Sequence, residues 1–388
     1  MCSTARVDRR IFLVALCGSS AAILTSCSRH SDGRAEAAEI LIGEYGSLTG
    51  STATIGLSTH NGIDMALDKA NTSGGVLGKK IRVVVEDDRG KPEEAQTVVT
   101  RLITKYGVSA ILGEATSTRS LAAAPIAQQS HIPMVTPSST NLRVTQVGDY
   151  IFRTCFTDAF PSLRMARFVS NNLSLTKLAI LRDIRNDYSV DLADVFTKDF
   201  QKVGGTIVAD EGYGEGDIDF SAQLTKIKSR NPQAIFIPGY YTEVALIARQ
   251  ARQLGLTIPL LGSGSWDSPR LLEIGGEALE GSYYFNHFSA GDSRPVVQEF
   301  VGEYRRRFGQ IPDVFAALGF DAAGVLIDAI RRANSTDPGK IRDSLAQTKD
   351  YPGVTGAITL DADRNAAKPV VFQRIVNRKI EFIETLEP

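Results

Sequence analysis

Short apolar segments alternate with longer amphipathic stretches along most of this chain. The apolar segments are rich in β-branched residues and end at glycine or at polar turns, as buried strands do. Between them, apolar residues recur at helical spacing, for example at Val98, Val99 and Leu102. Such alternation predicts an α/β protein with a parallel, doubly wound sheet. The strands expected in this first series are 40–43, 81–85, 108–112, 131–135 and 150–156.

The pattern starts again after residue 156. The chain shows further apolar segments at 178–181, 206–209, 234–238 and 260–261, with helical periodicity at 189–202, 221–228 and 242–254. This second series predicts a second lobe of the same Rossmann-like architecture.

The chain is expected to pass between the lobes three times. Two helical segments, 296–307 and 315–332, have apolar faces that need a sheet, and the first lobe is short of helices. A return crossing is therefore predicted near residues 286–290, and a third near Gly356. The expected lobes are 40–157 with 288–356, and 158–287 with 357–388. Three connections form a three-stranded hinge that lets two lobes close over a cleft.

Two polar turns lie at the centre of the first lobe, between Gly113 and Thr140. The first follows strand 108–112, and there Ser117 precedes an apolar helix that its hydroxyl can cap. The second turn, 136–140, follows the next strand. Successive parallel strands end on the same rim, where open α/β sheets bind ligands. Free N–H groups at a helix start attract carboxylate or phosphate. These hydroxyls have two possible interpretations: they are ordinary helix caps, or they form a site for a small anion.

Residues 1–27 have the features of an export signal. Arg6, Arg9 and Arg10 precede the apolar segment 11–24, which is too short to span a bilayer. The closing LTSC sequence resembles a bacterial lipobox, in which Cys27 would become the lipidated first residue. An uncleaved anchor and a cut without lipidation are alternatives, and the arginine pair also resembles a twin-arginine signal. Residues 28–39 then predict a flexible tether.

Charge, cysteine content and histidine positions argue against a nucleic-acid partner, a disulfide and a cofactor. The chain has 43% hydrophobic and 22% charged residues with a formal charge of −1, which gives no reason to expect a nucleic-acid partner. Beyond the signal only Cys155 remains, so no intrachain disulfide is expected in the folded body. The four histidines are scattered without ligand spacing, so neither a metal nor another cofactor is expected.

Several motifs together resemble a known family. They are Gly46 to Gly50, ILGEATST, IPMVTPSSTN, the Asn186-Asp187-Tyr188 turn, GDIDFSAQLTKIK, PGYYTEVALIARQARQLG, SWDSP and FAALGFDAA. In this order and spacing they are similar to the type I periplasmic binding proteins of branched-chain amino acid ABC importers, the Leu/Ile/Val-binding proteins. The likeness covers essentially the whole chain after the signal. It implies a monomeric Venus-flytrap receptor of the periplasm or cell envelope that captures an amino acid and docks on the transmembrane permease.

The resemblance also implies how the first lobe holds its ligand. Ser117 matches the serine whose hydroxyl meets the ligand carboxylate, and Thr140 matches a residue that contacts both carboxylate and ammonium. Ser138 and Ser139 match positions that offer backbone groups. These roles suit a zwitterion, whose carboxylate needs donors and whose ammonium needs acceptors.

The second lobe and the walls of the cleft follow the family in part. Tyr240 matches an aromatic residue over the ligand, and Tyr188 one at the cleft mouth. Ile55 stands where relatives have an aromatic residue, which leaves a smaller apolar wall. Thr116 stands where some members have a disulfide-bonded cysteine. Trp266, at a strand end, is expected either to stack on the ligand or to serve the hinge or core.

The largest departure concerns charge. The acidic residue that pairs with the ligand ammonium should fall at Gly264, so this partner is missing. Either Asp267 or Asp321 reaches the cleft instead, or the ligand lacks an ammonium and is an aromatic acid or an amide.

An enzyme and a sensor are the two other classes of function to compare with the sequence. An enzyme is not expected, because the chain has no nucleophile elbow, metalloprotease motif or P-loop, and no histidine near the two polar turns. Glu44, Glu114 and Glu243 lie near expected strand ends, but lone carboxylates beside turns are usually solvated. A sensor that presents its ligand to a receptor shares the expected fold and stays open as an alternative.

Overall fold

The structure is a computed structural model, and it describes residues 39–388. The expected signal, the lipidation site at Cys27 and all but the last residue of the expected tether lie outside the described residues. Within residues 39–388, no helix has the length and apolar character needed to cross a membrane.

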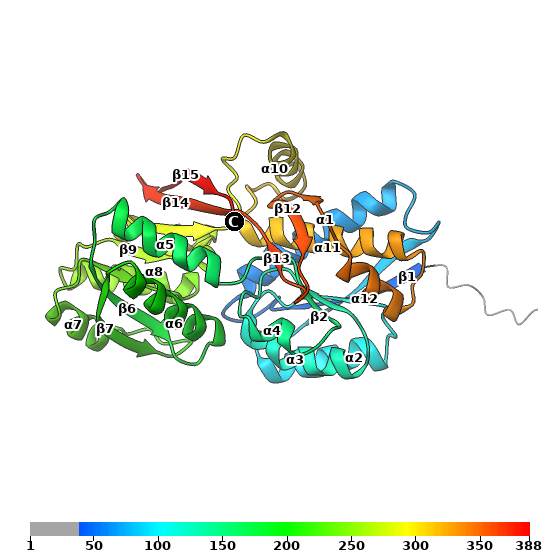
Figure 1. Ribbon diagram of the computed structural model, residues 1–388, viewed down its shortest axis with the longest axis horizontal. Coiled ribbons are helices and arrows are strands. Elements are labelled where there is room, and N and C mark those ends of the chain that lie inside the picture. The colour runs from blue at the N-terminus through cyan, green and yellow to red at the C-terminus, as the bar shows by residue number, and fades with distance from the viewer. Residues whose placement is uncertain (1–38) are drawn as a thin grey trace, which may run out of the picture. The chain divides into compact units, whose positions relative to one another are not determined.

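The first lobe is built on a five-stranded parallel sheet (Figure 1). Its strands, in spatial order, are β2 (Lys80–Asp87), β1 (Glu39–Gly46), β3 (Ile111–Leu112), β4 (Met134–Thr136) and β5 (Ile151–Arg153). Strands β3, β4 and β5 are short and completely buried, as expected for a sheet covered by helices on both faces.

Helices cover both faces of this sheet. The helices of the first lobe are α1 (Ala53–Thr72), α2 (Pro92–Thr104), α3 (Ser117–Gln129), α4 (Arg143–Gln146), α10 (Pro295–Phe308), α11 (Val314–Ala333) and α12 (Pro338–Ala346). On one face, Ile40, Ile42 and Val135 pack against the apolar sides of α1, α11 and α12. On the other face, Ile111 and Met134 pack against α2 and α3.

The second lobe has a seven-stranded mixed sheet. Its order is β15 (Lys379–Leu386), β14 (Val370–Val376), β10 (Tyr283–Asn286), β9 (Leu260–Gly262), β8 (Ala234–Phe236), β6 (Lys177–Asp183) and β7 (Thr206–Tyr213). Strands β6 to β10 are parallel to one another, whereas β14 and β15 run antiparallel at one edge of the sheet. The helices of this lobe are α5 (Ala159–Asn171), α6 (Asp187–Lys202), α7 (Ser221–Ser229), α8 (Tyr241–Gln253) and α9 (Pro269–Gly275), with short 3₁₀ turns at Gly264–Trp266 and Gly276–Leu279. The predicted α/β fold of two wound lobes is confirmed.

The expected third crossing near Gly356 is wrong. Strands β11 (Tyr351–Gly353), β12 (Gly356–Leu360) and β13 (Ala366–Ala367) form a small antiparallel sheet, and Ile358, Leu360 and Ala366 pack in the core of the first lobe. The chain joins the second sheet only at β14. The apolar face of β12 is buried by α11 and α12, which keeps β12 in the first lobe. The crossing therefore lies at residues 368–369, between β13 and β14.

Some local assignments also differ. The strand expected at 131–135 is observed at 134–136, since His131 has a positive φ of 54° at the end of α3. Ser117 was expected to cap α3, but it is the first helical residue, and Thr116 at the cap position makes no side-chain capping bond. The first N–H groups of α3 still lack partners inside the helix.

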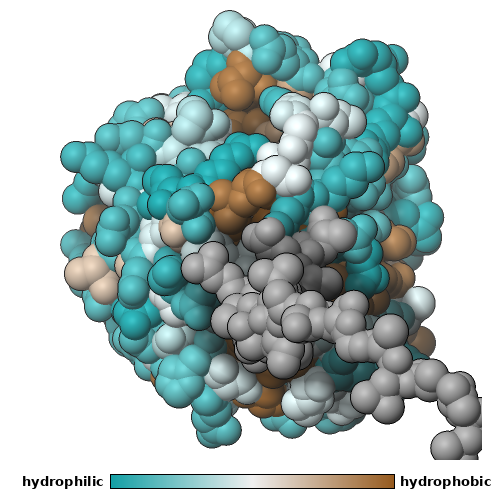
Figure 2. All heavy atoms as spheres, turned by 90° about the vertical axis from the view of Figure 1, so that its right-hand side faces the viewer, coloured by the Kyte–Doolittle hydropathy of each residue, from teal (hydrophilic) through white to brown (hydrophobic). Residues whose placement is uncertain are grey.

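The surface at one end of the molecule has no single large apolar area. Figure 2 looks at the end of the molecule where β1 begins, and its visible coloured surface is mainly hydrophilic with small, separate hydrophobic areas. Scattered exposed apolar residues of this kind are normal for proteins in water.

Helices α1 and α11 approach each other unusually closely (Figure 1). A Cβ added at Gly62 of α1 would lie 2.0 Å from the carbonyl oxygen of Ala316, and one at Gly319 of α11 would lie 2.4 Å from that of Thr59. Glycine is therefore required at this crossing for steric reasons, although it weakens helices elsewhere.

We predict that Gly62→Ala lowers the free energy of unfolding by about 1–3 kcal/mol, because the new methyl group forces the two helices apart. Gly302→Ala in α10 is the matched control, since a Cβ there meets no atom within 4 Å and alanine favours a helix. Urea unfolding of both variants measures the difference. Equal free energies of unfolding for the two variants would show that α1 and α11 can move apart at little cost.

Candidate functional site

A small cavity lies where the two lobes meet. Its lining comes from the polar turns of the first lobe, from Tyr188 and Tyr240 of the second lobe, and from the hinge. The lining residues are Ala115, Ser117, Ser138, Thr140, Phe156, Asp158, Tyr188, Tyr240, Gly264, Ser265, Phe285, His287, Val314, Phe315 and Leu318. Its volume is about 30 Å³, and contacts between the lobes flank it, such as the one from Arg119 to Glu215 at 3.3 Å.

The first lobe presents three hydroxyl groups to the cavity. Ser117 Oγ accepts a hydrogen bond from the Asn141 N–H at 3.3 Å, and Ser138 Oγ donates to the Ala115 carbonyl at 2.6 Å. The buried Thr140 hydroxyl has no hydrogen-bond partner among the described residues. These groups follow β3 and β4, whose carboxyl ends meet at one rim.

The second lobe contributes two aromatic side chains. The rings of Tyr188 and Tyr240 lie 5.6 Å apart at an angle of 34°. The Tyr188 hydroxyl contacts Ser263 Oγ and donates to Ser265 Oγ at 3.1 Å. Burial raises the pKa of both phenols, so both are neutral donors at physiological pH.

Asp158 contributes the one carboxyl group among the described residues that line the cavity, and it was not among the site residues predicted from the sequence. The residue is 3% exposed, and neither carboxylate oxygen has a hydrogen-bond partner among residues 39–388. Burial raises its pKa to about 7, against the lowering effect of the nearby Thr140 hydroxyl. One signal could have found it: Asp158 follows β5, the next parallel strand after the two polar turns.

The hinge side of the cavity is aromatic and apolar apart from His287. The imidazole stacks on Phe156 with ring centroids 3.4 Å apart, beside Phe285, Val314 and Leu318. No histidine was expected near the polar turns, but His287, which follows β10, lines the same cavity. It makes no hydrogen bond to Ser117.

The comparisons with known proteins agree with this arrangement. The family model described as periplasmic binding protein matches residues 39–379. The chain belongs to the periplasmic binding protein family. Relatives of this chain include proteins named for the binding of leucine, isoleucine and valine, such as one from Brucella melitensis that is 28% identical over 86% of this chain and 90% of its own length.

Three solved structures illustrate the relationship. A leucine binding protein from Thermotoga maritima is 40% identical, with 90% of this chain and 99% of that chain covered and a TM-score of 0.87. The branched-chain amino acid transporter substrate binding protein of Streptococcus pneumoniae, in complex with isoleucine, is 34% identical over 90% and 100% of the chains, with a TM-score of 0.85. A solute binding protein of an ABC transporter from Rhodopseudomonas palustris, in complex with 3,4-dihydroxybenzoic acid, is 25% identical over 90% and 97%, with a TM-score of 0.81.

Four residues expected at the site of this periplasmic binding protein do not line the cavity. Ser139 is buried behind it, with Oγ 2.8 Å from Ser120 Oγ. Thr116 bonds to Glu114 and accepts from Arg119 Nη1 at 2.9 Å. Ile55 and Trp266 belong to the hydrophobic core, and the indole N–H donates to the Ile237 carbonyl at 3.0 Å.

The two aspartates expected to replace the missing acid are structural. Asp267 accepts from the Val314 N–H at the start of α11 and from Asn286 Nδ2, each at 2.9 Å. Asp321 accepts from the N–H groups of Val354 and Thr355 and pairs with buried Lys368 at 3.8 Å. Both are occupied by the chain itself, and neither lines the cavity.

Gly264 has a steric reason to lack a side chain. A Cβ at this position would lie 2.9 Å from Asn286 Oδ1, whose amide bridges Asp267 and Gln373 in the hinge. The second lobe therefore cannot place an acid there without disturbing the hinge network.

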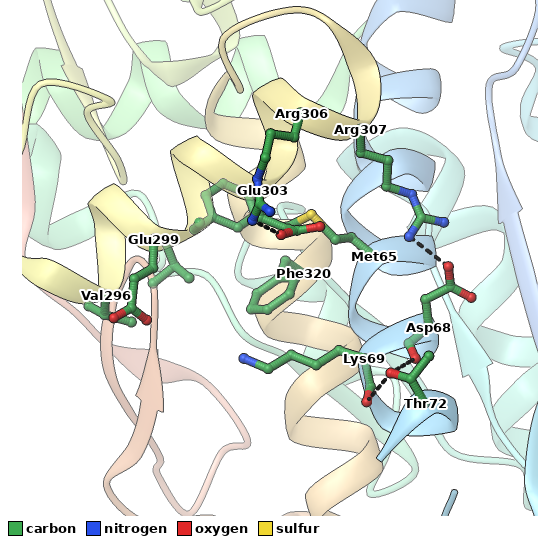
Figure 3. Close-up of a pocket in the computed structure, with 12 residues that line it drawn as sticks. Met65, Asp68, Lys69, Thr72, Val296, Glu299, Glu303, Arg306, Arg307 and Phe320 are labelled. Carbon is green, nitrogen blue, oxygen red and sulfur yellow. Dashed lines mark hydrogen bonds and ion pairs between the residues drawn. The ribbon is translucent and has the colours of Figure 1, made fainter. Parts of the chain in front are cut away.

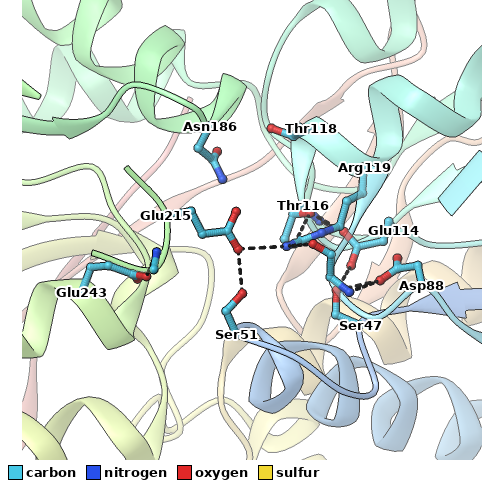
Figure 4. A network of polar contacts seen from close by, with 12 residues as sticks. Ser47, Ser51, Asp88, Glu114, Thr116, Thr118, Arg119, Asn186, Glu215 and Glu243 are labelled. Carbon is cyan, nitrogen blue, oxygen red and sulfur yellow. Dashed lines mark hydrogen bonds and ion pairs between the residues drawn. The ribbon is translucent and has the colours of Figure 1, made fainter. Parts of the chain in front are cut away.

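A polar network joins the lobes beside the cavity (Figure 4). Arg119 of α3 is 3% exposed and donates to the Gly90 carbonyl at 2.6 Å and to Glu215 of the second lobe at 3.3 Å. Glu215 also accepts from Ser51 Oγ at 2.6 Å. Burial lowers the pKa of Arg119, but nearby carboxylates, Glu114 first, raise it above its usual value.

Buried acids complete the first-lobe side of this network. Ser47 Oγ lies 2.9 Å from both Asp88 and Glu114, and burial together with Glu114 raises the pKa of Asp88 to about 7. The other acids considered from the sequence also have protein partners, Glu44 with His60 and Glu243 with the Gly216 N–H. In residues 39–388 no group of three or more potential ligands could hold a metal ion.

A second, larger groove lies on the first lobe, away from the interlobe cavity (Figure 3). It holds about 550 Å³ between α1, α10 and α11, around Met65, Phe300 and Phe320. Its rim charges are partly paired, since Arg307 contacts both Asp64 and Asp68. It contains none of the residues expected from the family.

We predict that Glu215→Gln weakens ligand binding by up to about fivefold without changing the ligand contacts, because the Glu215 side chain is 35% exposed and an ion pair open to solvent on one side contributes at most about 1 kcal/mol to closure. Glu211→Gln is the control, since Glu211 pairs with Lys226 inside the second lobe at 2.7 Å. Calorimetry measures affinity and small-angle scattering measures the ligand-free radius. Identical behaviour of both variants would exclude a role of Glu215 in closure.

Proposed function

We propose that this protein is the extracytoplasmic binding component of an ABC importer and that it captures an α-amino acid between its lobes for delivery to the permease. The family and the relatives named for leucine and bound to isoleucine support an amino acid as ligand. The expected permease subunits follow from the same relatives.

The observation that carries the amino-acid assignment is the buried carboxylate of Asp158, which among residues 39–388 has no partner within hydrogen-bond distance and only the Thr140 hydroxyl as a neighbouring donor. A buried charge without a partner is costly, and it persists where a ligand supplies the opposite charge. Ser117 and Thr140 line the same cavity, and Ser117 is the first residue of α3, a helix start of the kind that suits a carboxylate. Donors for an anion and an acceptor for a cation in one small cavity match the two charges of an amino acid.

Binding then proceeds by capture and closure. The first lobe holds the carboxylate on Ser117, Thr140 and neighbouring N–H groups, and it holds the ammonium on Asp158. Tyr188 and Tyr240 of the second lobe add their contacts only in the closed form. The ligand therefore stabilises the closed state by its higher affinity for that state.

A small carboxylic acid without an ammonium is the second candidate ligand. The relative bound to 3,4-dihydroxybenzoic acid favours it, together with the missing acid at Gly264 and the aromatic hinge side of the cavity. Such a ligand would leave Asp158 unpaired, so the protonation state of Asp158 separates the two candidates. Binding rather than catalysis is proposed, since Ser117 contacts the Asn141 N–H and no general base.

Export to the periplasm and attachment to the membrane through a lipid on Cys27 complete the proposal. The sequence of residues 1–27 supports both. Mass spectrometry of the membrane fraction tests them, and a Cys27→Ala variant released as soluble protein would agree with a lipid anchor.

We predict that amino-acid affinity rises with pH, by at most tenfold per unit, between about pH 5 and pH 7, and then levels off. The folded-state pKa of Asp158 is raised to about 7, and the ligand ammonium binds its deprotonated form. A carboxylic acid without an ammonium should instead bind the protonated form of Asp158, so its affinity should stay constant below about pH 7 and fall above it. Asp158→Asn should remove the slope and weaken amino-acid binding at pH 8 by about 10- to 100-fold. An unchanged slope in this variant would refute the assignment.

Asp158 also affects stability without ligand. Its raised pKa means that the folded state binds a proton more tightly than the unfolded state, so its contribution to stability is complete below about pH 4 and is lost as pH rises to about 7. Between pH 5 and pH 8, the melting temperature of Asp158→Asn should fall less than that of the wild type.

We expect Ser117→Ala and Thr140→Val each to weaken binding about 10- to 100-fold, because each removes a hydrogen bond to a charged group. The fold should remain intact. Ser130→Ala at the exposed end of α3 is the matched control. Wild-type affinity of both site variants in calorimetry would place the ligand elsewhere.

A further inference from the structure

His287 is a polar group on an otherwise apolar wall of the cavity. It follows β10 (Tyr283–Asn286), is 6% exposed, and is fixed by stacking on Phe156 with an interplanar angle of 17°. Its backbone N–H donates to Asn286 Oδ1 at 2.9 Å, which anchors the residue to the hinge. The side chain is therefore held in one place at the cavity.

The ring nitrogens of His287 are not satisfied by the protein. Neither makes a hydrogen bond among residues 39–388, and Nδ1 is completely buried. Buried polar groups in proteins almost always have partners, and those that do not are often completed by a ligand or water. Since the imidazole lines the cavity, a cavity ligand is the nearest source of such a partner.

The imidazole is uncharged. Burial, and secondarily the charge of Lys368, holds the pKa of His287 well below its usual value. A neutral imidazole has one donor and one acceptor nitrogen. It therefore suits a hydroxyl or an amide, which can both give and receive a hydrogen bond.

His287 and Asp158 both line the cavity but come from different elements. Asp158 follows β5, on the side of the first-lobe turns, whereas His287 follows β10 in the second sheet. Phe285, Val314 and Leu318 form the wall beside His287. With the charged ends of an amino acid at Ser117 and Asp158, the imidazole is left to the side chain of the ligand.

We propose that His287 is a specificity-determining residue that selects amino acids whose side chain carries a hydroxyl or amide over purely aliphatic ones of the same size. This inference rests on the proposed amino-acid function. It differs from what the leucine- and isoleucine-binding relatives suggest.

Two nearly isosteric pairs test the proposal by calorimetry: threonine against valine, and asparagine against leucine. The wild-type protein should bind the polar member of at least one pair about tenfold or more tightly, because the apolar member leaves the imidazole unpaired. Equal or tighter binding of the apolar member in both pairs would overturn the proposal.

The variant His287→Phe keeps the stacking on Phe156 and removes both nitrogens. It should abolish the preference by weakening the polar member about tenfold, while the apolar member keeps its affinity. His287→Gln, which restores a donor and an acceptor, should recover part of the preference. His131→Phe is the matched control, since His131 packs edge-on against Tyr150 outside the cavity.

Melting curves establish that each variant is folded before its affinities are compared. A preference that survives in both folded His287 variants would overturn the proposal. If no free amino acid binds the wild-type protein, the proposed function fails instead. If amino acids bind without a polar preference, only the role of His287 fails.

Discussion

The structure depends on a cleft whose polar groups the chain leaves without partners. The Asp158 carboxylate, the Thr140 hydroxyl and the His287 imidazole are all buried where the lobes meet, and the protein satisfies none of them completely. Elsewhere such burial destabilises a fold. Here it concentrates unmet hydrogen-bonding capacity in one small cavity, which is what a receptor needs in order to gain free energy from a ligand rather than from itself.

The hinge shows the opposite arrangement, because its polar groups are satisfied by the chain. Asn286 bridges Asp267 and Gln373, and Asp267 in turn receives the first N–H of α11. Asp321 performs a similar role with residues 354–355 and Lys368. These acids lie close to the crossings but serve the connections between lobes. Residue type alone therefore does not separate a binding acid from a structural one.

Closure has its own contacts, distinct from those expected for the ligand. Arg119 is held in the first lobe and reaches Glu215, and on the other flank Asn141 donates to the Asp187 carbonyl at 3.1 Å. Each such contact is worth little at a half-exposed site. A ligand that binds the closed form more tightly than the open form shifts the equilibrium toward closure.

The sequence determined the alternating strands and helices, the two lobes and the polar turns of Ser117 and Thr140, because periodicity and strand ends are local features. It could not assign the acids. Asp158 precedes an ordinary helix start, and only the parallel alignment of β5 with β4 brings it to the rim. His287, Ile55 and Trp266 likewise gave no local signal of whether they face the cleft or the core. The third crossing was misplaced because β12 has no helix after it, and only the packing of Ile358 and Leu360 fixes its lobe. Contacts between residues far apart in the chain decided these points, since burial and partners depend on the assembled fold.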